Sequence, residues 1–595
     1  MAPKPHKDIT RIKLFWLCGA VYLLVIALSI SYNMYTSFFP ISIRLCHDEA
    51  EHLHVAYLLS EGQKPFVDFI ENHPTLFNHY LRWLGDITGV TTTRDWAFYA
   101  RATIFAHFLV CLVVFCCWTS NLISHRPRGW PWIGLLVCAW GMVGLHSGWL
   151  YFMWQIRPDW ICYAYTLLGC YLFYLHFRHR SGTGNGNSYM SLLVLGGILI
   201  GVGNAILPKG IIVLVAFVFT LLTKHLIYGA DIPREITLDS DVKDFGIFVL
   251  AGVFSFLGAM LFDCYLSRIG MDEWINAVFL LNQKKHIIYT STETNAVTWL
   301  INIFSAGFSV MLGLAGWLIW ELSRLRLERK NDGIGSLILF SLFTIITSLL
   351  MPSYTHGATW PYNYIPSLLA VAAIYLVLLL RVYHLCMASL SHNVSKLRIY
   401  SLAAIVTVVL VHTTVQPVNS VRKYQLRKAL SRKVQMLAPS DYLPDQALPT
   451  SLVYLTRYPH TIPVMAHHWG YHFMLSEASN FWEDNYKLGL GPNPSEVWES
   501  GFGDSPPDAI VFQNSTEVIR FILELQYCQH LNAGWLIDAI NRDYVRMQYK
   551  QYKYPSIYVR RDNVAYFEGR GWQINPSEKA QPFSSIINKR NAEDH

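Results

Sequence analysis

The chain has 595 residues, of which 53% are hydrophobic and 15% are charged, and its mean hydropathy is +0.27. Soluble proteins carry about 25% charged residues, so this composition excludes a disordered chain, a collagen-like chain and a small disulfide scaffold, and it indicates a protein partly embedded in lipid. The net charge is +7, and the excess of Lys and Arg lies largely in short loops between apolar runs, which disfavours a nucleic-acid partner because such proteins usually cluster their basic residues on one face.

Apolar segments follow one another along most of the chain, and each is about as long as the 20-residue helix that crosses a bilayer. Eleven such segments run over residues 13–32, 96–118, 131–149, 159–177, 189–206, 210–228, 245–265, 296–320, 334–351, 363–382 and 397–415. Lys and Arg are enriched in alternate loops, beginning with the N-terminal segment. Because cytoplasmic loops carry these residues, we expect a polytopic α-helical membrane protein with a cytoplasmic N-terminus and its C-terminal part on the opposite side.

The last part of the chain has the composition of a soluble domain. Short apolar runs at residues 452–455, 509–512 and 557–559 predict buried strands, and residues 517–527 and 531–541 predict helices. We therefore expect a transmembrane domain over residues 1–415, with a first outer loop over residues 33–95, and an extracytoplasmic α/β domain over residues 416–595.

The densest group of ionisable residues follows the first span, in the run Cys46-His47-Asp48-Glu49-Ala50-Glu51-His52. We expect a helix that begins near Asp48 and carries Glu51 and His52 on the same face. A helix N-terminus favours an ionised carboxylate, so Asp48 could accept a proton or orient a hydroxyl group. Two other interpretations stay open: a solvated helix cap with ordinary surface charges, and a divalent-metal site made of His47, Asp48, Glu51 and His52.

A second helix is predicted over residues 74–84, after an extended connector that contains His73 and further carboxylates. Leucine and aromatic residues line one face of this helix, whereas Asn78, His79 and Arg82 lie on the opposite face. This pattern predicts an interfacial helix that lies on the bilayer surface.

Three cations and a carboxylate stand at the ends of later spans. Arg157 and Asp159 precede the fourth span, Lys209 lies in a tight Pro-Lys-Gly turn, and Arg101 lies about one turn inside the second span. A charge in the apolar zone costs several kcal/mol unless it is paired or reaches water. An interfacial anchor, a helix cap or a snorkelling side chain would explain each residue singly. Together with Asp48, they favour one site for an anionic lipid head group.

Four motifs resemble those of the GT-C membrane glycosyltransferases. His47-Asp48-Glu49 resembles the Asp-Glu motif of that superfamily, and residues 56–81 are similar to the first outer loop of its bacterial branch related to protein O-mannosyltransferases. That branch includes lipid A aminoarabinose transferases and lipopolysaccharide core-sugar transferases. Arg157-Pro158-Asp159 resembles the second acidic motif of the branch, and the run from Trp360 to Pro366 resembles its late motif. The resemblance covers roughly residues 10–380 in order and topology.

The resemblance implies a GT-C-like fold and an inverting glycosyltransferase that needs no metal or other cofactor. It would move a single sugar from a polyprenyl-phosphate donor to an envelope glycan or glycolipid, on the periplasmic face of a bacterial inner membrane. Asp48, Asp159 and Glu49 would be the catalytic residues, with Asp48 as the base. Lys209, Arg157 and Arg101 would bind the donor phosphate. The residues around the acceptor, or just behind those that contact it, would be Glu51, His52, His73 and Tyr362.

Several alternatives remain open. The acceptor could be a protein, or the chain could be a glycan polymerase or ligase of the same fold. A transporter is disfavoured because the apolar runs lack mid-membrane ionisable groups and paired broken helices. A non-catalytic binding module could use the histidines of the run 467–472. Whether Cys46 and Cys528 form a disulfide is also open.

Overall fold

The structure is a computed structural model in which most of the helical segments and parts of the C-terminal region are described. Apart from single positions near the N-terminus, these are residues 47–60, 62–65, 71, 73–90, 93–123, 126–144, 153–183, 189–228, 238–281, 334–354, 365–389, 452–455, 509–512, 534–549, 556–569 and 572–574. The chain forms two compact units, each discontinuous in sequence. One comprises Met1–Phe38, Ile104–Ala259 and Tyr289–Leu426, and the other comprises Phe39–Thr103, Met260–Ile288 and Arg427–His595.

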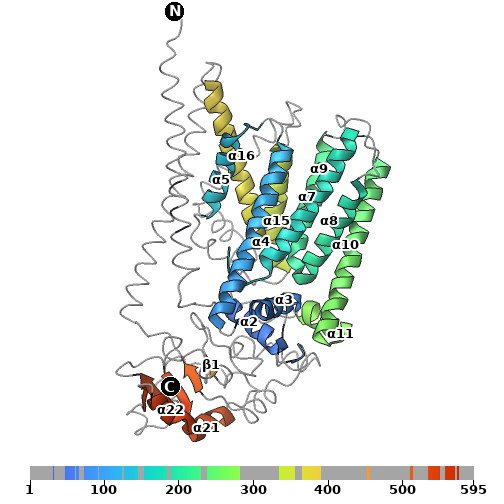
Figure 1. Ribbon diagram of the computed structural model, residues 1–595. Helices are drawn as coiled ribbons and strands as arrows, with labels where there is room; N and C mark the ends of the chain where they lie inside the picture. The colour runs from blue at the N-terminus through green and yellow to red at the C-terminus, as the bar shows by residue number, and fades with distance from the viewer. Residues whose placement is uncertain are drawn as a thin grey trace, which may run out of the picture. The chain divides into compact units, whose positions relative to one another are not determined.

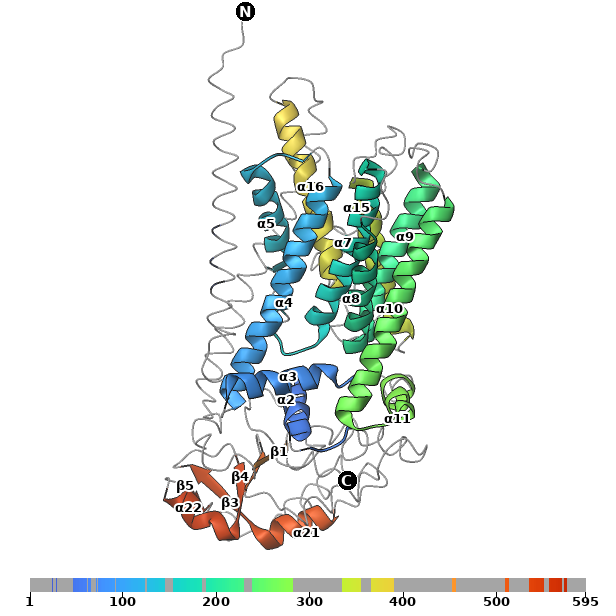
Figure 2. The ribbon, with the colours of Figure 1, turned by 45° about the vertical axis from the view of Figure 1, so that its right-hand side comes forward.

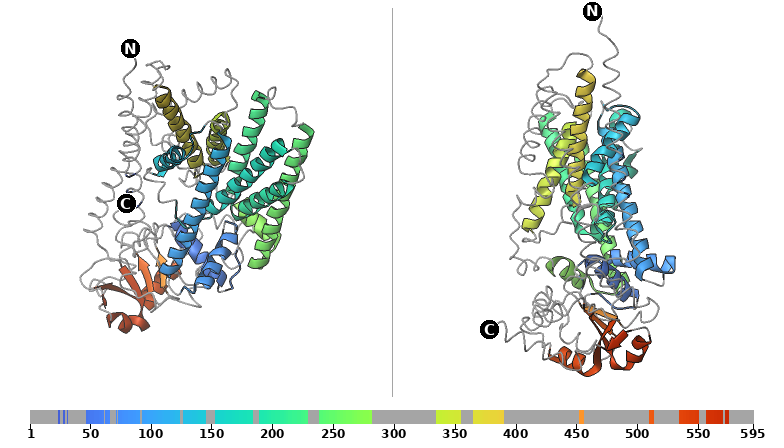
Figure 3. Two further views of the ribbon diagram at one scale, coloured as in Figure 1. Left: turned by 45° about the horizontal axis from the view of Figure 1, so that its top comes forward. Right: turned by 90° about the vertical axis from the view of Figure 1, so that its left-hand side faces the viewer.

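The first unit is built from long apolar helices that run side by side (Figure 1). Its helices, two of which continue into the second unit, are α4 (Thr93–Leu122), α5 (Trp130–Gly144), α7 (Asp159–Thr183), α8 (Met190–Ile206), α9 (Ile211–Tyr228), α10 (Leu238–Ser267), α15 (Ile334–Tyr354) and α16 (Ile365–Ser389). Helix α7 packs against α8, and α15 packs against both α9 and α16. Figure 3 shows the neighbouring helices α7 and α8 from a second direction.

These eight helices coincide with eight of the eleven predicted spans. Four of them contain stretches long and apolar enough to cross a membrane: Asp95–Leu122, Asp159–Arg180, Lys243–Ser267 and Pro366–His384. The chain is therefore a multi-pass membrane protein by the length and composition of its helices. Predicted spans 296–320 and 397–415, and nearly all of 13–32, lie outside the described residues, so the number eleven stays a prediction.

Glycines allow α8 to approach its neighbours closely. A methyl group added at Gly197 would meet the Phe248 carbonyl oxygen, and one added at Gly201 would meet the Gly252 carbonyl oxygen, both on α10. Small residues at such positions let two backbones come into direct contact, which is how helices without a hydrophobic driving force associate in lipid. This packing fixes the helix that leads into the Lys209 turn.

The second unit begins with two short helices, α2 (His47–Ser60) and α3 (Leu76–Thr88), which pack against each other. It also contains α11 (Met271–Ile275) and the π-helical turn η4 (Asn276–Leu281). Helix α3 is the predicted amphipathic helix, but two residues of its polar face are buried. Asn78 and His79 are each only 1% exposed, because both side chains hydrogen-bond to other segments.

The C-terminal part of the second unit contains a five-stranded sheet with the order β1-β2-β4-β3-β5. Its strands are β1 (Leu452–Leu455), β2 (Ala509–Phe512), β3 (Tyr544–Tyr549), β4 (Ser556–Arg560) and β5 (Trp572–Ile574). Among these described strands, β1 and β2 pair in parallel and the other pairs are antiparallel. Helix α21 (Gly534–Asp543) lies beside β3, and α22 (Val564–Glu568) lies beside β5 (Figure 2).

This sheet confirms the three predicted strands and the helix predicted over residues 531–541, which is α21. The helix predicted over 517–527 lies outside the described residues. Side chains at the paired register positions form the core of the sheet, where Met547 and Val559 are fully buried and Trp572 is nearly so.

Candidate functional site

Two cations share one buried carboxylate in the helical unit. Asp159 is the first residue of α7, and its side chain is fully buried. Arg157 Nε donates a hydrogen bond to Asp159 Oδ2 at 2.9 Å, and Lys209 Nζ lies 3.5 Å from Asp159 Oδ1. The Lys209 side chain is the most exposed of the three, at 16%. We refer to Arg157, Asp159 and Lys209 as the Asp159 cluster.

The sequence of the turn explains how Lys209 reaches Asp159. Helix α8 ends at Ile206, Pro208-Lys209-Gly210 makes a single 3-10 turn, and α9 begins at the next residue. A Cβ atom at Gly210 would lie 2.5 Å from Thr166 Oγ1 and 2.8 Å from Cys162 Sγ on α7. Only glycine allows this approach, so the turn lies directly on the first turns of α7, where Asp159 begins the helix.

The structure therefore brings together three of the residues that the sequence predicts to converge. Arg157 and Asp159 are neighbours in sequence, but Lys209 comes from a different helix pair. In the structure the three residues form one ion-pair cluster. The binding and catalytic roles predicted for these residues stay predictions.

A second buried ion pair holds the beginning of α2. Arg101 on α4 donates from Nε to Glu49 Oε1 at 2.8 Å and from its terminal nitrogen to Glu49 Oε2 at 2.7 Å. Both side chains are at most 2% exposed. A bidentate pair of this kind fixes orientation as well as distance. It anchors the helical turn that carries Asp48, whose own side chain lies outside the described part, as do those of His47, Glu51 and Tyr362.

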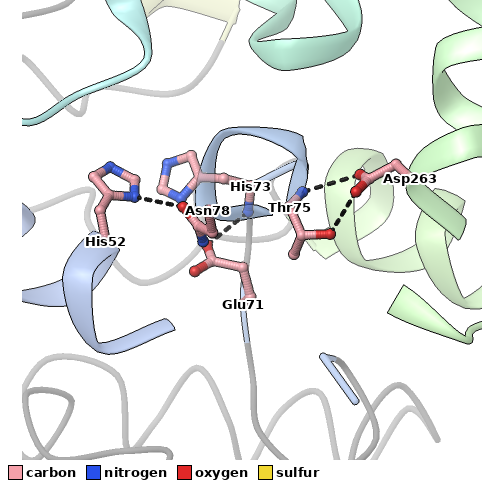
Figure 4. Close-up of polar contacts among 6 residues, drawn as sticks. All are labelled: His52, Glu71, His73, Thr75, Asn78 and Asp263. Carbon is pink, nitrogen blue, oxygen red and sulfur yellow. Dashed lines mark hydrogen bonds and ion pairs between the residues drawn. The ribbon is translucent and has the colours of Figure 1, made fainter. Parts of the chain in front are cut away.

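Polar side chains also cluster where the connector enters α3 (Figure 4). The His73 backbone N–H and ring Nδ1 both lie within 2.9 Å of Glu71 Oε1. Because a carboxylate oxygen accepts hydrogen bonds, Nδ1 carries the proton in this bond. The other ring nitrogen of His73, Nε2, takes no part in the bond to Glu71. His52 Nδ1 lies 3.3 Å from Asn78 Oδ1, and the rings of His52 and His73 are 5.7 Å apart. Glu71 is buried, whereas the His73 side chain is 31% exposed.

Asp263, near the end of α10, is a further buried carboxylate in the second unit. It accepts hydrogen bonds from the Thr75 backbone N–H at 3.0 Å, the Thr75 hydroxyl at 2.6 Å and the Trp274 indole N–H at 2.8 Å. Figure 4 shows the two bonds from Thr75. The Thr75 hydroxyl also meets Ser267 Oγ, which in turn lies 2.9 Å from His79 Nε2. Burial, with Arg82 nearby, lowers the pKa of His79 from 6.5 to about 4.

Sequence reasoning missed the roles of Glu71 and Asp263. Asp263 lies inside the predicted apolar span 245–265. A lone carboxylate in such a span must find donors, and that requirement is the signal that could have identified it.

The metal-site alternative is not tested by the described residues. Among them, no three His, Cys, Asp or Glu side chains lie together in a way that could hold a metal ion. Three of the four side chains proposed for that site, those of His47, Asp48 and Glu51, fall outside them.

The fold matches a solved membrane protein along almost its whole length. The crystal structure of ArnT from Cupriavidus metallidurans bound to undecaprenyl phosphate superimposes with a TM-score of 0.51 and 12% identity, covering 91% of this chain and 98% of that chain. ArnT is a GT-C membrane glycosyltransferase. The chain has a GT-C-like fold. The likeness confirms, at the level of the fold, the resemblance seen in the sequence motifs.

The chain also matches the structure of an archaeal protein, with a lower TM-score. The oligosaccharyltransferase AglB from Archaeoglobus fulgidus, in complex with an inhibitory peptide and a dolichol-phosphate, matches with a TM-score of 0.48 and 12% identity, covering 96% of this chain and 76% of that chain. No protein-family model and no curated protein matches the sequence.

Proposed function

We propose that the chain is an inverting glycosyltransferase that moves a single sugar from a polyprenyl-phosphate donor to a glycan or glycolipid acceptor. The Asp159 cluster carries this proposal, because it holds two cations in fixed orientations at the end of an apolar helix in a GT-C-like fold. The ArnT structure of that fold was solved with undecaprenyl phosphate bound, which supports a lipid phosphate as the ligand. We further propose that the reaction takes place on the extracytoplasmic side of a bacterial inner membrane.

The leaving group explains why such a cluster is needed. When the bond between the anomeric carbon and the phosphate oxygen breaks, the lipid phosphate gains negative charge and needs no proton. Its departure is favoured by cationic donors held in a poorly hydrated place. Lys209 and Arg157 supply these donors, and Asp159 orients both. Arg101 keeps its proposed contribution to phosphate binding, and its pair with Glu49 adds a second role as an anchor of α2.

The acceptor half of the reaction is assigned to the outer-loop residues. The acceptor hydroxyl oxygen attacks the anomeric carbon from the face opposite the phosphate, and its proton passes to Asp48. The transition state resembles an oxocarbenium ion, so the proton can leave late and a weakly basic carboxylate suffices. We assign His73, whose Nδ1 binds Glu71, to the acceptor side together with His52, Glu51 and Tyr362.

The test is transfer by the purified full chain in liposomes, with a radiolabelled polyprenyl-phosphate sugar and cell-envelope glycolipid as acceptor. We expect one sugar to be added per acceptor with inverted anomeric configuration. Asp48→Asn should abolish transfer and leave donor binding intact. Asp86→Asn, which changes an exposed carboxylate on α3, should remain active.

Three results would contradict the proposal or redirect it. Full activity of Asp48→Asn would remove Asp48 as the base. Addition of many sugars, or modification of a protein only, would assign the chain to the polymerase or protein-transferase alternative. Movement of the lipid-linked sugar across the bilayer without a new glycosidic bond would identify a transporter.

A further inference from the structure

The hydrogen bonds around Asp263 connect two parts of the chain that are far apart in sequence. Asp263 is fully buried near the end of α10, and its two carboxylate oxygens accept three hydrogen bonds. Two of these come from Thr75, which is 188 residues away. A buried carboxylate is tolerated only when donors replace its water, so this set of bonds specifies one arrangement of α3 and the end of α10.

Asp263 acts as the cap of helix α3 from outside that helix. Thr75 occupies the N-cap position, where threonine commonly accepts a hydrogen bond from its own helix, but its side chain makes no such bond. The first turn of α3 also contains no acidic residue. The Asp263 carboxylate instead accepts hydrogen bonds from the Thr75 hydroxyl and backbone N–H at the N-terminal end of the helix.

Two further contacts make this connection continuous with the body of α3. Ser267, one turn after Asp263 on α10, lies 2.8 Å from the Thr75 hydroxyl and 2.9 Å from His79 Nε2. The first turn of α3 is thus held at both Thr75 and His79. Helix α3 cannot slide or tilt at its N-terminus without breaking several buried hydrogen bonds.

Thr75, where α3 is anchored, comes two residues after His73, which is hydrogen-bonded to Glu71. We propose that Asp263 is a positioning residue that acts through Thr75 to hold His73 in the geometry used for sugar transfer. This inference rests on the proposed function, in which His73 lies on the acceptor side. Because Glu71 fixes His73 from one side and Thr75 fixes the chain two residues later, loss of the Asp263 bonds releases one of the two restraints.

The experiment compares Asp263→Asn, Thr75→Val and Thr75→Ser in the liposome transfer assay, with Asp86→Asn as the matched control on an exposed part of α3. Thr75→Val keeps the shape of the side chain but removes the hydroxyl, whereas Thr75→Ser retains it. We expect Asp263→Asn and Thr75→Val to lower kcat by about tenfold to a hundredfold, the scale of a small misplacement of reacting groups, with the donor KM nearly unchanged. Thr75→Ser, which retains the hydroxyl group, should keep most of the wild-type kcat.

Two readouts separate positioning from simple loss of folded protein. Combining Asp263→Asn with His73→Gln should cost less than the product of the two single effects, because Asp263 acts through His73. Hydrogen exchange of the peptide covering residues 71–82 should accelerate in Asp263→Asn and Thr75→Val, but not in Asp86→Asn.

The outcomes distinguish this inference from the proposed function. If the wild-type chain transfers no sugar, the proposed function fails and the positioning role fails with it. If the wild type is active and Asp263→Asn matches it in kcat, only the positioning role is overturned. Faster exchange with unchanged kcat, or fully independent effects with His73→Gln, would show that Asp263 serves α3 stability alone and would also overturn the inference.

Discussion

Lys209 Nζ lies 3.5 Å from Asp159 Oδ1, and Arg157 Nε lies 2.9 Å from the other oxygen of the same carboxylate. One fully buried acidic group therefore orients two cations from different parts of the chain, one just before α7 and one in the turn between α8 and α9. This arrangement differs from a lysine that merely reaches for the membrane surface, because the ion pair sets the direction of its ammonium group.

Removing the Lys209 ammonium should weaken the use of the lipid-phosphate donor. We expect Lys209→Ala to lower kcat/KM by about a hundredfold, since a cation held beside a leaving phosphate stabilises the charge that develops there. Lys209→Arg should retain part of the activity. The measurement is the transfer rate against donor concentration, with Lys243→Ala, which removes an exposed lysine, as the control. Unchanged kinetics for Lys209→Ala would leave snorkelling as the better explanation.

The position of Lys209 should depend on Gly210. In Gly210→Ala the new methyl group would lie 2.5 Å from Thr166 Oγ1 and 2.8 Å from Cys162 Sγ, so the turn must move away from α7. We expect lower donor use and a lower thermal unfolding temperature in detergent. Gly246→Ala is the matched control, because its methyl group would meet nothing within 4 Å and alanine favours a helix over glycine. Equal behaviour of the two variants would show that the turn tolerates displacement.

The sequence was sufficient for the features set by local pattern. Hydropathy located eight described helices, and short apolar runs located three strands, because burial in lipid or in a sheet core acts on short segments. The Asp159 cluster was also predictable, since Arg157 and Asp159 are two residues apart and a lysine in a tight turn between spans needs a partner. Motif resemblance supplied the fold, which the match to ArnT confirms.

Contacts between side chains far apart in the sequence could not be predicted. Arg101 was expected at the donor phosphate, and the structure shows its bidentate bond to Glu49, which lies 52 residues away. Amphipathic periodicity placed Asn78 and His79 on a polar face, yet His52 and Ser267 provide partners that allow both to be buried. Periodicity reports the average polarity of a face and cannot reveal a partner from another segment.

Breaking the Glu49–Arg101 pair should destabilise the protein strongly. Arg101→Met would remove the bidentate partner of the buried Glu49 carboxylate, and breaking one side of a buried ion pair typically costs about 3–5 kcal/mol. The double variant Glu49→Gln/Arg101→Met should recover much of this lost stability, because neither position then carries a charge. Thermal unfolding of the purified protein measures the effect. Asp86→Asn, which breaks the exposed pair with Arg82, should change stability by less than about 1 kcal/mol. A double variant no better than Arg101→Met would contradict this assignment.

Acidification should destabilise the anchored end of α3 through His79. The pKa of His79 is lowered from 6.5 to about 4, chiefly by burial and secondly by Arg82. Between these two pH values the unfolded chain binds more protons than the folded one. The stability that neutral His79 contributes is therefore fully present above pH 6.5 and is lost as the pH falls toward 4, by up to about 3 kcal/mol.

The pH dependence can be assigned to His79 by comparing variants. Thermal unfolding measured from pH 7.5 down to about 4 should decline less steeply in His79→Gln than in the wild type, because the glutamine amide does not titrate in this range. His179→Gln, which replaces an exposed histidine stacked on Tyr189, should follow the wild-type curve. If His79→Gln also follows it, the acid sensitivity arises from other groups, and protonation of His79 is then not what loosens the contact of α3 with Ser267.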